Sequence, residues 1–370
     1  MEWMATAAFG LEGLVKKELE QLGFKASAGQ GGARFEADPE GAFRANLWLA
    51  CADRVLMVLG ERPVNRFEEL FDFVHSLPWG ELLPRDAAFP VSGNCVRSQL
   101  MSVSDCQRIA KKAIARKLTE KYMQDWLPET GAVYPVSVTL HQDVARVTLD
   151  ASGDALNKRG YRTWVGEAPL RETLAAALVR LSPWKPGGPL YDPFCGTGTL
   201  LIEAAFLASG RAPGLDRRFA MERWAGFSAQ AADWMRREAR ARYRKEEIAG
   251  IRGSDLDPEA LKLCARHLRQ AGLEGLVHVE QKDVREVRLG EKAPCFLTNP
   301  PYGERLGDRK KSAQIAAALG RLLAGHPGAT LCAITADPAF ERQAGRKANS
   351  RRRLYNGRIE CEFLVMRQEQ

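Results

Sequence analysis

The spacing of apolar residues predicts a mixture of helices and short strands in the first 165 residues. Apolar side chains at helical spacing predict helices over 11–22, 39–49, 67–76 and 104–124. Short apolar or alternating runs predict strands at 33–36, 54–59, 89–93, 136–140 and 144–149. The last two runs flank a three-residue turn, which is typical of a hairpin. This part of the chain therefore has the pattern of an α+β fold.

From about residue 185 the pattern changes to short apolar runs, each followed by a turn and a helical stretch. The runs lie at 190–192, 250–254, 277–281, 295–299 and 330–335. This alternation is typical of a doubly wound α/β fold with a mostly parallel sheet. Residues 352–355 and 359–366 flank Asn356-Gly357, a pair that favours a hairpin turn. We therefore expect the parallel sheet to end in an antiparallel hairpin.

Composition and length indicate a globular protein of two or three domains, because 45% of the 370 residues are hydrophobic and 27% are charged. No apolar run approaches the roughly 20 residues that cross a bilayer. Residues 1–4 lack the cationic start of a signal peptide. We therefore expect a cytoplasmic protein with no membrane partner.

The eight cysteines and five histidines are scattered along the chain. The two cysteines closest in sequence, Cys95 and Cys106, are eleven residues apart, so no Cys-x-x-Cys pair is present for zinc or redox chemistry. Most of the cysteines have the pattern of small buried apolar residues. We expect no bound metal.

The formal net charge of +8 is concentrated in one segment. Residues 1–165 carry a net charge of −1, whereas residues 305–358 carry +9, from twelve basic and three acidic side chains. A local basic surface is what binding to a phosphate backbone requires, and a solvated surface is the alternative. The candidate RNA-binding residues are Arg305, Arg351, Arg352 and Arg353 in this segment, and Arg108, Lys112 and Arg116 on the helix predicted over 104–124.

A glycine-rich turn, residues 192–199, follows the first strand of the α/β part and precedes a helix over 200–208. Gly196 and Gly198 allow a tight turn and a close approach of a ligand, and the helix N-terminus offers unpaired N–H groups. The turn lacks the Gly-Lys-Ser/Thr of a triphosphate site, and Leu201 replaces the third glycine of the dinucleotide fingerprint. The pattern indicates a nucleotide-like ligand, with a purely structural turn as the alternative.

Acidic residues follow the next two strands. Asp255 can accept hydrogen bonds from ribose hydroxyls. Asp257 can instead cap the following helix, because Pro258 suits the first helical position. Asp283 can accept the amino group of an adenine, or it can be an ordinary loop residue.

The fourth strand ends at the residues Asn299-Pro300-Pro301-Tyr302. The side-chain oxygen of Asn299 and the carbonyl of Pro300 are two acceptors made rigid by consecutive prolines. Two such acceptors can bind both hydrogens of an exocyclic amine and direct its lone pair at an electrophile. Tyr302 can stack on the base, which must be unpaired or flipped out. A proline-rich turn without chemistry is the alternative.

In this order, at the ends of successive strands, the motifs resemble those of the class I S-adenosylmethionine-dependent methyltransferases, whose amino-methylating branch carries Asn-Pro-Pro-Tyr. The resemblance implies catalytic roles for Asn299, Pro300 and Tyr302. It implies S-adenosyl-L-methionine as cofactor, with its methionine part at Asp192, Gly196 and Gly198, its ribose at Asp255 and its adenine at Asp283. Further implied cofactor-binding residues are Phe194 and Asp257, within these motifs, and Arg171 and Thr173, in a stretch that resembles the helix before the first motif.

The resemblance covers nearly the whole chain. Residues 1–64 resemble a ferredoxin-like subdomain, residues 65–165 a THUMP RNA-binding domain, and residues 166–370 the Rossmann-like methyltransferase domain with its seven-stranded, mostly parallel sheet. The segments 212–224 and 354–361 resemble the branch that contains the N-terminal half of the bifunctional large-subunit ribosomal RNA guanine-N2 methyltransferases. Those enzymes continue into a second methyltransferase domain, whereas this sequence stops at Gln370, so we expect a single activity.

These observations lead to the hypothesis of methyl transfer from S-adenosyl-L-methionine to the N2 amine of a guanine in 23S ribosomal RNA. The alternatives are a transfer-RNA guanine-N2 methyltransferase, an adenine-N6 DNA methyltransferase and a non-catalytic RNA-binding assembly factor. The THUMP-like region argues against the DNA enzyme. The intact glycine, aspartate and asparagine motifs argue against a factor without catalysis.

Overall fold

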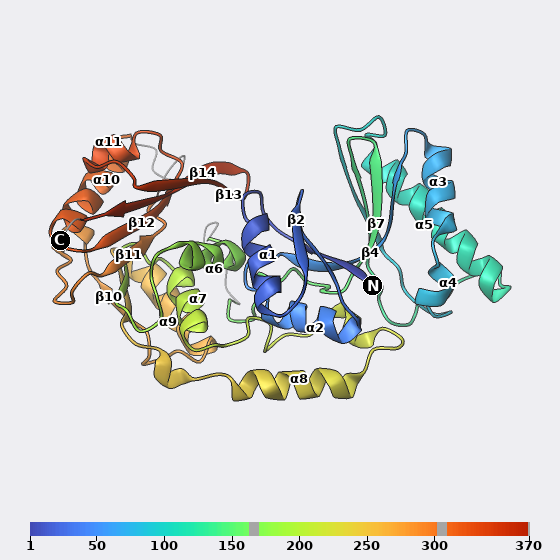
Figure 1. Cartoon of the computed structure of the whole chain (residues 1–370), viewed down its shortest axis with the longest axis horizontal. Coiled ribbons are helices and arrows are strands. Elements are labelled where there is room, and N and C mark those ends of the chain that lie inside the picture. The colour runs from blue at the N-terminus through green and yellow to red at the C-terminus, as the bar shows by residue number, and fades with distance from the viewer. Residues whose placement is uncertain (163–169, 302–308, 369–370) are drawn as a thin grey trace. The chain divides into compact units, whose positions relative to one another are not determined.

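The computed structural model of the chain describes residues 1–162, 170–301 and 309–368. The chain forms two compact units. The first comprises Met1–Ala7, Val15–Leu156 and Arg218–Arg237, and the second comprises Ala8–Leu14, Asn157–Arg217 and Glu238–Gln370. Within the described residues, each unit contains one seven-stranded sheet (Figure 1).

The first unit contains the elements of an α+β fold. Its strands are β1 (Glu2–Thr6), β2 (Ala26–Gly29), β3 (Gly32–Glu36), β4 (Arg54–Pro63), β5 (Val91–Val96), β6 (Val136–His141) and β7 (Val144–Asp150). Its helices are α2 (Pro39–Trp48), α3 (Phe67–Ser76), α4 (Trp79–Leu82), α5 (Val103–Tyr122) and the 3-10 turn η1 (Ala220–Arg223). Helices α1 (Glu12–Gln21) and α8 (Ala229–Ala241) each have residues in both units.

The sheet of the first unit has the strand order β2-β3-β1-β4-β7-β6-β5, and only β5 and β6 pair in parallel. Strand β6 alternates buried and half-buried residues, which confirms the predicted hairpin with β7. Strand β4 runs past the predicted end at residue 59 through an irregularity between Val58 and Gly60. It pairs with β1 on one side and with β7 on the other. The stretches expected to resemble ferredoxin-like and THUMP domains therefore share one continuous sheet.

The second unit contains alternating strands and helices. Its strands are β8 (Leu190–Asp192), β9 (Ile251–Asp255), β10 (His278–Gln281), β11 (Cys295–Thr298), β12 (Thr330–Thr335), β13 (Ser350–Asn356) and β14 (Ile359–Arg367). Its helices are α6 (Glu172–Leu181), α7 (Thr199–Ala208), α9 (Pro258–Gln270), α10 (Arg309–Ala324), α11 (Phe340–Ala344) and the 3-10 turns η2 (Lys245–Glu247) and η3 (Val284–Glu286).

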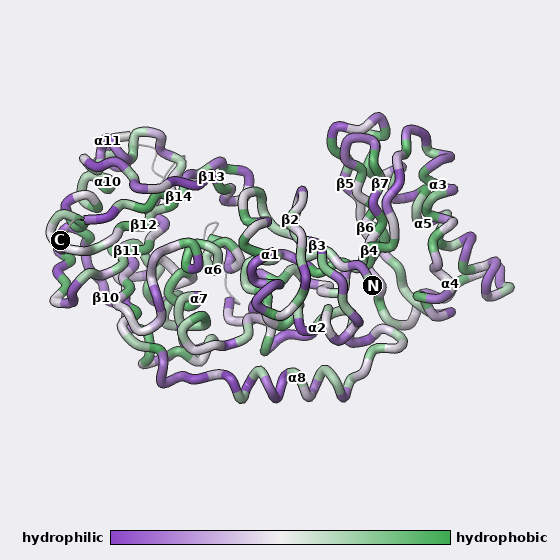
Figure 2. The backbone as a smooth tube through the Cα atoms, viewed as in Figure 1, coloured by the Kyte–Doolittle hydropathy of each residue, from purple (hydrophilic) through white to green (hydrophobic). Residues whose placement is uncertain are grey.

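The sheet of the second unit has the order β10-β9-β8-β11-β12-β14-β13. Strands β8 to β12 pair in parallel, and β14 and β13 form the antiparallel hairpin predicted from Asn356-Gly357. Both faces of the sheet are covered, so β11 is buried at every position. Phe296 packs into a cluster with α10, and Figure 1 shows α6 and α7 on the other side of the strands. Figure 2 shows that α7 is hydrophobic along its length and that β13 is hydrophilic.

Across the described ranges, no helix combines the length and the apolar character that a membrane span requires. The same residues contain no group of three or more His, Cys, Asp or Glu side chains placed to hold a metal ion.

Because β4 pairs with both β1 and β7, we expect the first sheet to unfold as one cooperative unit. Amide hydrogens of β1, β4 and β7 should lose protection at the same urea concentration in native-state hydrogen exchange. Two separate transitions, one for β1 and another for β6 and β7, would show that the sheet divides into independent domains.

Candidate active site

The carboxyl ends of β8, β9 and β11 lie beside one another at the point where the strand order of the second sheet reverses. β8 has β9 as one neighbour and β11 as the other, and all three run in the same direction. In open α/β sheets, ligands bind at the carboxyl edge at such a point. The topology therefore brings together the glycine turn after β8, the acidic loop after β9 and the Asn-Pro-Pro segment after β11.

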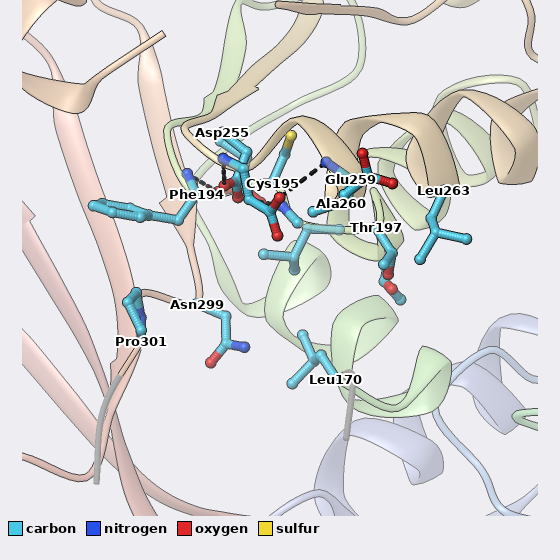
Figure 3. Close-up of a pocket in the computed structure, with 15 residues that line it drawn as sticks. Leu170, Phe194, Cys195, Thr197, Asp255, Glu259, Ala260, Leu263, Asn299 and Pro301 are labelled. Carbon is cyan, nitrogen blue, oxygen red and sulfur yellow. Dashed lines mark hydrogen bonds between the residues drawn. The ribbon is translucent and has the colours of Figure 1, made fainter. Parts of the chain in front are cut away.

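A cavity of about 500 Å³ opens at this edge, and we call it the carboxyl-edge cavity (Figure 3). The predicted site residues that line it are Asp192, Phe194, Gly196, Asp255, Asp257 and Asn299. The residues that the sequence did not single out are Leu170, Cys195, Thr197, Thr199, Leu200, Glu259, Ala260, Leu263 and Pro301. Three of these come from the first turns of α9, where their spacing places them on one helix face.

The glycine turn is shaped by helix packing as well as by the cavity. Gly196 and Gly198 both have positive φ angles, of 50° and 83°. A Cβ atom on Gly198 would lie 2.5 Å from the Sγ of Cys264 in α9, so only glycine fits there. The ring of His267, also in α9, lies within hydrogen-bond distance, 3.1 Å, of the Thr197 carbonyl. Gly198 therefore sets the approach of α7 to α9, while Gly196 lines the cavity.

The carboxylate of Asp255 joins the loops that follow β8 and β9. The Gly196 N–H donates to its Oδ2 at 2.8 Å, and the Asp257 N–H donates to its Oδ1 at 3.0 Å. Asp257 accepts a hydrogen bond from the Glu259 N–H at 2.9 Å and caps α9, with Pro258 at the first helical position. Asp257 is thus a helix cap as well as a cavity residue.

Asp192 ends β8 and is 1% exposed. Its Oδ1 accepts a hydrogen bond from the Phe194 N–H at 3.1 Å. Burial, with a smaller contribution from the negative charge of Asp255, raises the pKa of Asp192 to about 7, although the hydrogen bond from the Phe194 N–H acts in the opposite direction. A buried carboxyl that lines a cavity suits a ligand that brings a positive charge or hydrogen-bond donors.

Asn299 projects into the carboxyl-edge cavity from the end of β11, on the side where Leu170 lies (Figure 3). Its Oδ1 atom is buried and has no hydrogen-bond partner among the described residues. Such an atom costs about 1–3 kcal/mol relative to a paired one, so its retention points to an external donor. Pro300 follows as a buried residue, whereas Tyr302 lies outside the described residues.

A second cavity of about 860 Å³ shares Phe194, Asp255, Asp257 and Pro301 with the first. Its wall includes Ile315 and Ala318 of α10, so it offers an apolar surface. Asp283 lines this second cavity and not the first. The guanidinium of Arg285 binds the Asp283 carboxylate at 2.9 and 2.5 Å and holds its pKa below the ordinary value. The predicted adenine acceptor is therefore already paired with a cation.

The stretch before α6 contributes a different residue from those expected. Arg171 is the exposed N-cap of α6, and Thr173 is 4% exposed within the helix. Neither lines either cavity, whereas Leu170 lines the carboxyl-edge cavity. The expected stretch thus reaches the cavity through Leu170, and the cofactor-binding roles of Arg171 and Thr173 stay predictions.

A buried charge network supports the starts of α6 and α7. Arg162 binds the Glu172 carboxylate at 3.2 Å, the Leu170 carbonyl at 3.2 Å and the Thr199 hydroxyl. Leu170 and Thr199 both line the carboxyl-edge cavity. Arg162 is therefore a positioning residue for this wall.

The predicted RNA-binding residues occupy two surfaces. Arg351, Arg352 and Arg353 are exposed on β13, and Arg351 pairs with Glu341 at 3.0 Å. Arg305 lies outside the described residues. On α5, Arg108 pairs with Asp105 at 2.7 Å, Arg116 pairs with Glu120 at 2.9 Å, and Lys112 is exposed. Local carboxylates thus neutralise part of the expected basic face of α5.

A doubly wound sheet with a terminal antiparallel hairpin, a glycine turn after β8 and an Asn-Pro-Pro segment after β11 define a class I methyltransferase domain. Three family models match the chain: the RMKL-like methyltransferase domain at residues 159–364, the RlmL ferredoxin-like domain at 2–56 and the THUMP domain at 64–150. The chain belongs to the RMKL-like methyltransferase family.

Relatives match almost end to end. "Putative RNA methyltransferase YpsC" of Bacillus subtilis (strain 168) is 39% identical over 97% of this chain and 94% of its own length. The structure of a "predicted N6-adenine-specific DNA methylase" from Listeria monocytogenes str. 4b F2365 is 39% identical, with a TM-score of 0.93 over 98% of this chain and 95% of that one. The structure of SMU.472, "a putative methyltransferase complexed with SAH", is 36% identical, with a TM-score of 0.95 over 100% and 98%.

S-adenosyl-L-methionine is the methyl donor of this class of enzyme, and the carboxyl edge suits it. Asp192 is a buried acceptor, Asp255 presents a fixed carboxylate and α7 directs its N-terminus at the cavity. The second cavity adds an apolar wall for a planar base. These residues would hold the amino-acid, ribose and base parts of the cofactor. The expected cofactor itself is confirmed by the family match and by the SAH-bound relative.

Because burial raises the pKa of Asp192 from 3.8 to about 7, its ionisation should destabilise the folded chain as the pH rises. Below about pH 4 the carboxyl is protonated in both states. Between about pH 4 and 7 only the unfolded chain loses the proton, so the free energy of unfolding falls. Above about pH 7 the loss is complete.

Asp192→Asn removes this titration. Its free energy of unfolding relative to wild type should increase between pH 4 and 7 and then stay constant, as measured by urea denaturation at several pH values. Asp72→Asn, at an exposed position of α3, serves as the control. If the free energy of unfolding of Asp192→Asn relative to wild type did not change with pH, the pKa of Asp192 would not be raised in the folded chain.

Proposed function

We propose that this methyltransferase modifies RNA, and that its target is the N2 amine of a guanine in large-subunit ribosomal RNA. The proposal is supported by the buried Oδ1 of Asn299 at the carboxyl-edge cavity, which has no hydrogen-bond partner in the part of the chain that the structure describes. An acceptor at the end of β11, followed by the carbonyl of Pro300, suits an exocyclic amine with two hydrogens. The same geometry does not suit a ring carbon or a ribose hydroxyl as well, because neither presents two donors.

The chain's own residues perform positioning and electrostatic stabilisation in this proposal. S-adenosyl-L-methionine supplies an electrophilic methyl group when bound. Asn299 and the Pro300 carbonyl accept the two amine hydrogens and direct the nitrogen lone pair toward that group. Positive charge develops on the nitrogen as the bond forms, so both acceptors bind more strongly in the transition state than in the ground state. The amine attacks as the neutral species and releases its proton afterwards, so no strong base is required.

The preference for RNA rests on the first unit. Its residues 64–150 match the THUMP domain, and YpsC, which matches over 97% of this chain, carries the name of an RNA methyltransferase. The name of the Listeria structure instead specifies adenine in DNA. An Asn-Pro-Pro segment recognises an amine and not a particular base, so it is compatible with either name. The THUMP match is the feature that favours RNA.

The preference for guanine N2 in ribosomal RNA rests on family resemblance. The N-terminal residues 2–56 match the RlmL ferredoxin-like domain. The segments 212–224 and 354–361 resemble the guanine-N2 branch of the family. Transfer RNA remains the second candidate substrate, because the motifs do not distinguish the two RNAs.

Replacing Asn299 with alanine tests the proposed amine site. Asn299→Ala should reduce kcat by at least about a hundred-fold, because one fixed partner of the developing charge is lost. Its dissociation constant for S-adenosylhomocysteine, measured by calorimetry, should stay within about two-fold of wild type. Asn94→Ala, at an exposed position of β5, provides the matched control. If Asn299→Ala kept its turnover, or lost turnover and cofactor binding together, Asn299 would not be the residue that binds the target amine.

The substrate is identified by incubating the protein with labelled S-adenosyl-L-methionine and unmodified 23S ribosomal RNA, transfer RNA or DNA. We expect N2-methylguanosine in ribosomal RNA. If N2-methylguanosine formed in transfer RNA alone, transfer RNA and not ribosomal RNA would be the substrate. N6-methyladenine in DNA would overturn it, and cofactor binding with no product on any nucleic acid would favour a non-catalytic factor.

A further inference from the structure

An exposed aromatic ring lies beside the basic strand β13 in the second unit. Phe9, in the segment that precedes α1, is 55% exposed. Its ring meets that of Tyr355 edge to face, with 5.7 Å between centroids, and the Arg353 guanidinium lies 5.3 Å from its centroid. We call Phe9, Tyr355, Arg352 and Arg353 the Phe9 cluster.

The backbone around Phe9 is held in place although its ring is exposed. Gly10 has a φ of +87°, and a Cβ atom there would lie 2.7 Å from the Arg353 carbonyl oxygen. The Arg352 guanidinium donates to the Gly10 carbonyl at 3.1 Å. Tyr355 in turn donates its hydroxyl hydrogen to Glu360 at 2.7 Å. The exposed ring is therefore preorganised, which reduces the entropic cost of binding a partner.

The Phe9 cluster lies at the same edge of the sheet as the carboxyl-edge cavity. Thr298, which precedes Asn299, aligns with Ala333 on β12, which aligns with Leu364 on β14 and then Arg351 on β13. Three strand spacings of about 4.8 Å separate Thr298 from Arg351 by about 14 Å. Arg352, Arg353 and Tyr355 continue β13 beyond this row in the direction of the carboxyl edge. A stacked nucleic-acid strand covers this row with about four nucleotides, and Arg353 and Tyr355 lie further along β13.

The charge of the cluster suits a phosphate backbone. Arg351, Arg352 and Arg353 are consecutive and exposed on β13, which Figure 2 shows as a hydrophilic strand. Arg352 donates a hydrogen bond to the Gly10 carbonyl. Because a carbonyl carries no formal charge, this contact does not neutralise the guanidinium. Glu360 lies 4.0 Å from Arg353 and neutralises part of the cluster. A net positive charge next to an exposed ring is the combination that binds single-stranded nucleic acid.

We propose that the Phe9 cluster binds an unpaired nucleotide of the RNA substrate a few positions from the target base. The base of this nucleotide stacks on Phe9, and the phosphates on either side of it pair with Arg352 and Arg353. This inference rests on the proposed RNA function, and it adds a binding site outside the cofactor and amine positions. The target base must leave its stack to reach Asn299, so the strand around it is unpaired, and a second stacking site holds that strand open.

Three substitutions of Phe9 separate base stacking from packing. Phe9→Leu keeps an apolar side chain against Tyr355 but has no aromatic face, Phe9→Ala removes both, and Phe9→Trp keeps an aromatic face. Trp234→Ala is the matched control, because Trp234 on α8 is 54% exposed, close to the value for Phe9. The probes are a single-stranded RNA of about 12 nucleotides, its duplex and S-adenosylhomocysteine.

We expect Phe9→Ala and Phe9→Leu to raise the dissociation constant for the single strand by about 5- to 140-fold, the range that loss of one base stack produces. Phe9→Trp and Trp234→Ala should bind it as wild type does. Binding of S-adenosylhomocysteine should be unchanged in all variants. On the methylated RNA, the KM should rise for Phe9→Ala while kcat at saturation changes little.

If Phe9→Leu bound the single strand with wild-type affinity, Phe9 would only pack against its neighbours. If the Phe9 variants lost affinity equally for the duplex and the single strand, Phe9 would not stack on an unpaired base. Either result overturns the inference while the proposed function stands. Failure of the wild-type protein to methylate any RNA would overturn the proposed function itself. The wild-type methylation assay and the Phe9 binding series therefore test the two separately.

Discussion

The carboxylate of Asp255 is the contact on which the geometry of the site depends. It accepts one N–H from the turn after β8 and one from its own loop, so it couples two strand ends at the point where the sheet order reverses. Gly198 then brings α7 against Cys264 of α9, and Arg162 ties the starts of α6 and α7 to the same wall. These contacts define the geometry of the edge without a bound ligand, as positioning catalysis requires.

The site retains polar groups that destabilise the fold in isolation. Asp192 is buried with a raised pKa, and the Oδ1 of Asn299 has no partner among the described residues. Elsewhere in the second unit, buried charge is compensated. Arg159 contacts Glu203 at 3.5 Å, and the Tyr161 hydroxyl donates to the same carboxylate at 3.1 Å. At the cavity, a bound cofactor and a target amine can satisfy Asp192 and Asn299, whereas the pair of Arg159 and Glu203 supports the fold.

The positions of the strands and of the motifs in the second unit were predictable, because buried parallel strands read as continuous apolar runs and site residues follow directly after them. Asp192, Asp255 and Asn299 were expected at the site from their positions after strands and from the family resemblance, and all three line the cavity. Side-chain direction was not predictable: Leu170 and not Thr173 faces the cavity, and Asp283 pairs with Arg285. Strand β2, Ala-Ser-Ala-Gly, has low strand propensity and forms through hairpin pairing with β3, which the apolar pattern does not reveal. The same holds for the Phe9 cluster, whose members are distant in sequence.

In the function we propose, one edge of the second sheet holds both the methyl donor and the target amine. A crystal structure of the protein with S-adenosylhomocysteine would test this arrangement. We expect the amino-acid part near Asp192 and Gly196, the ribose at Asp255 and the base against the wall formed by Ile315 and Ala318, with the sulfur facing Asn299. A ligand bound away from this edge, or with its sulfur turned away from Asn299, would show that the edge does not serve both purposes.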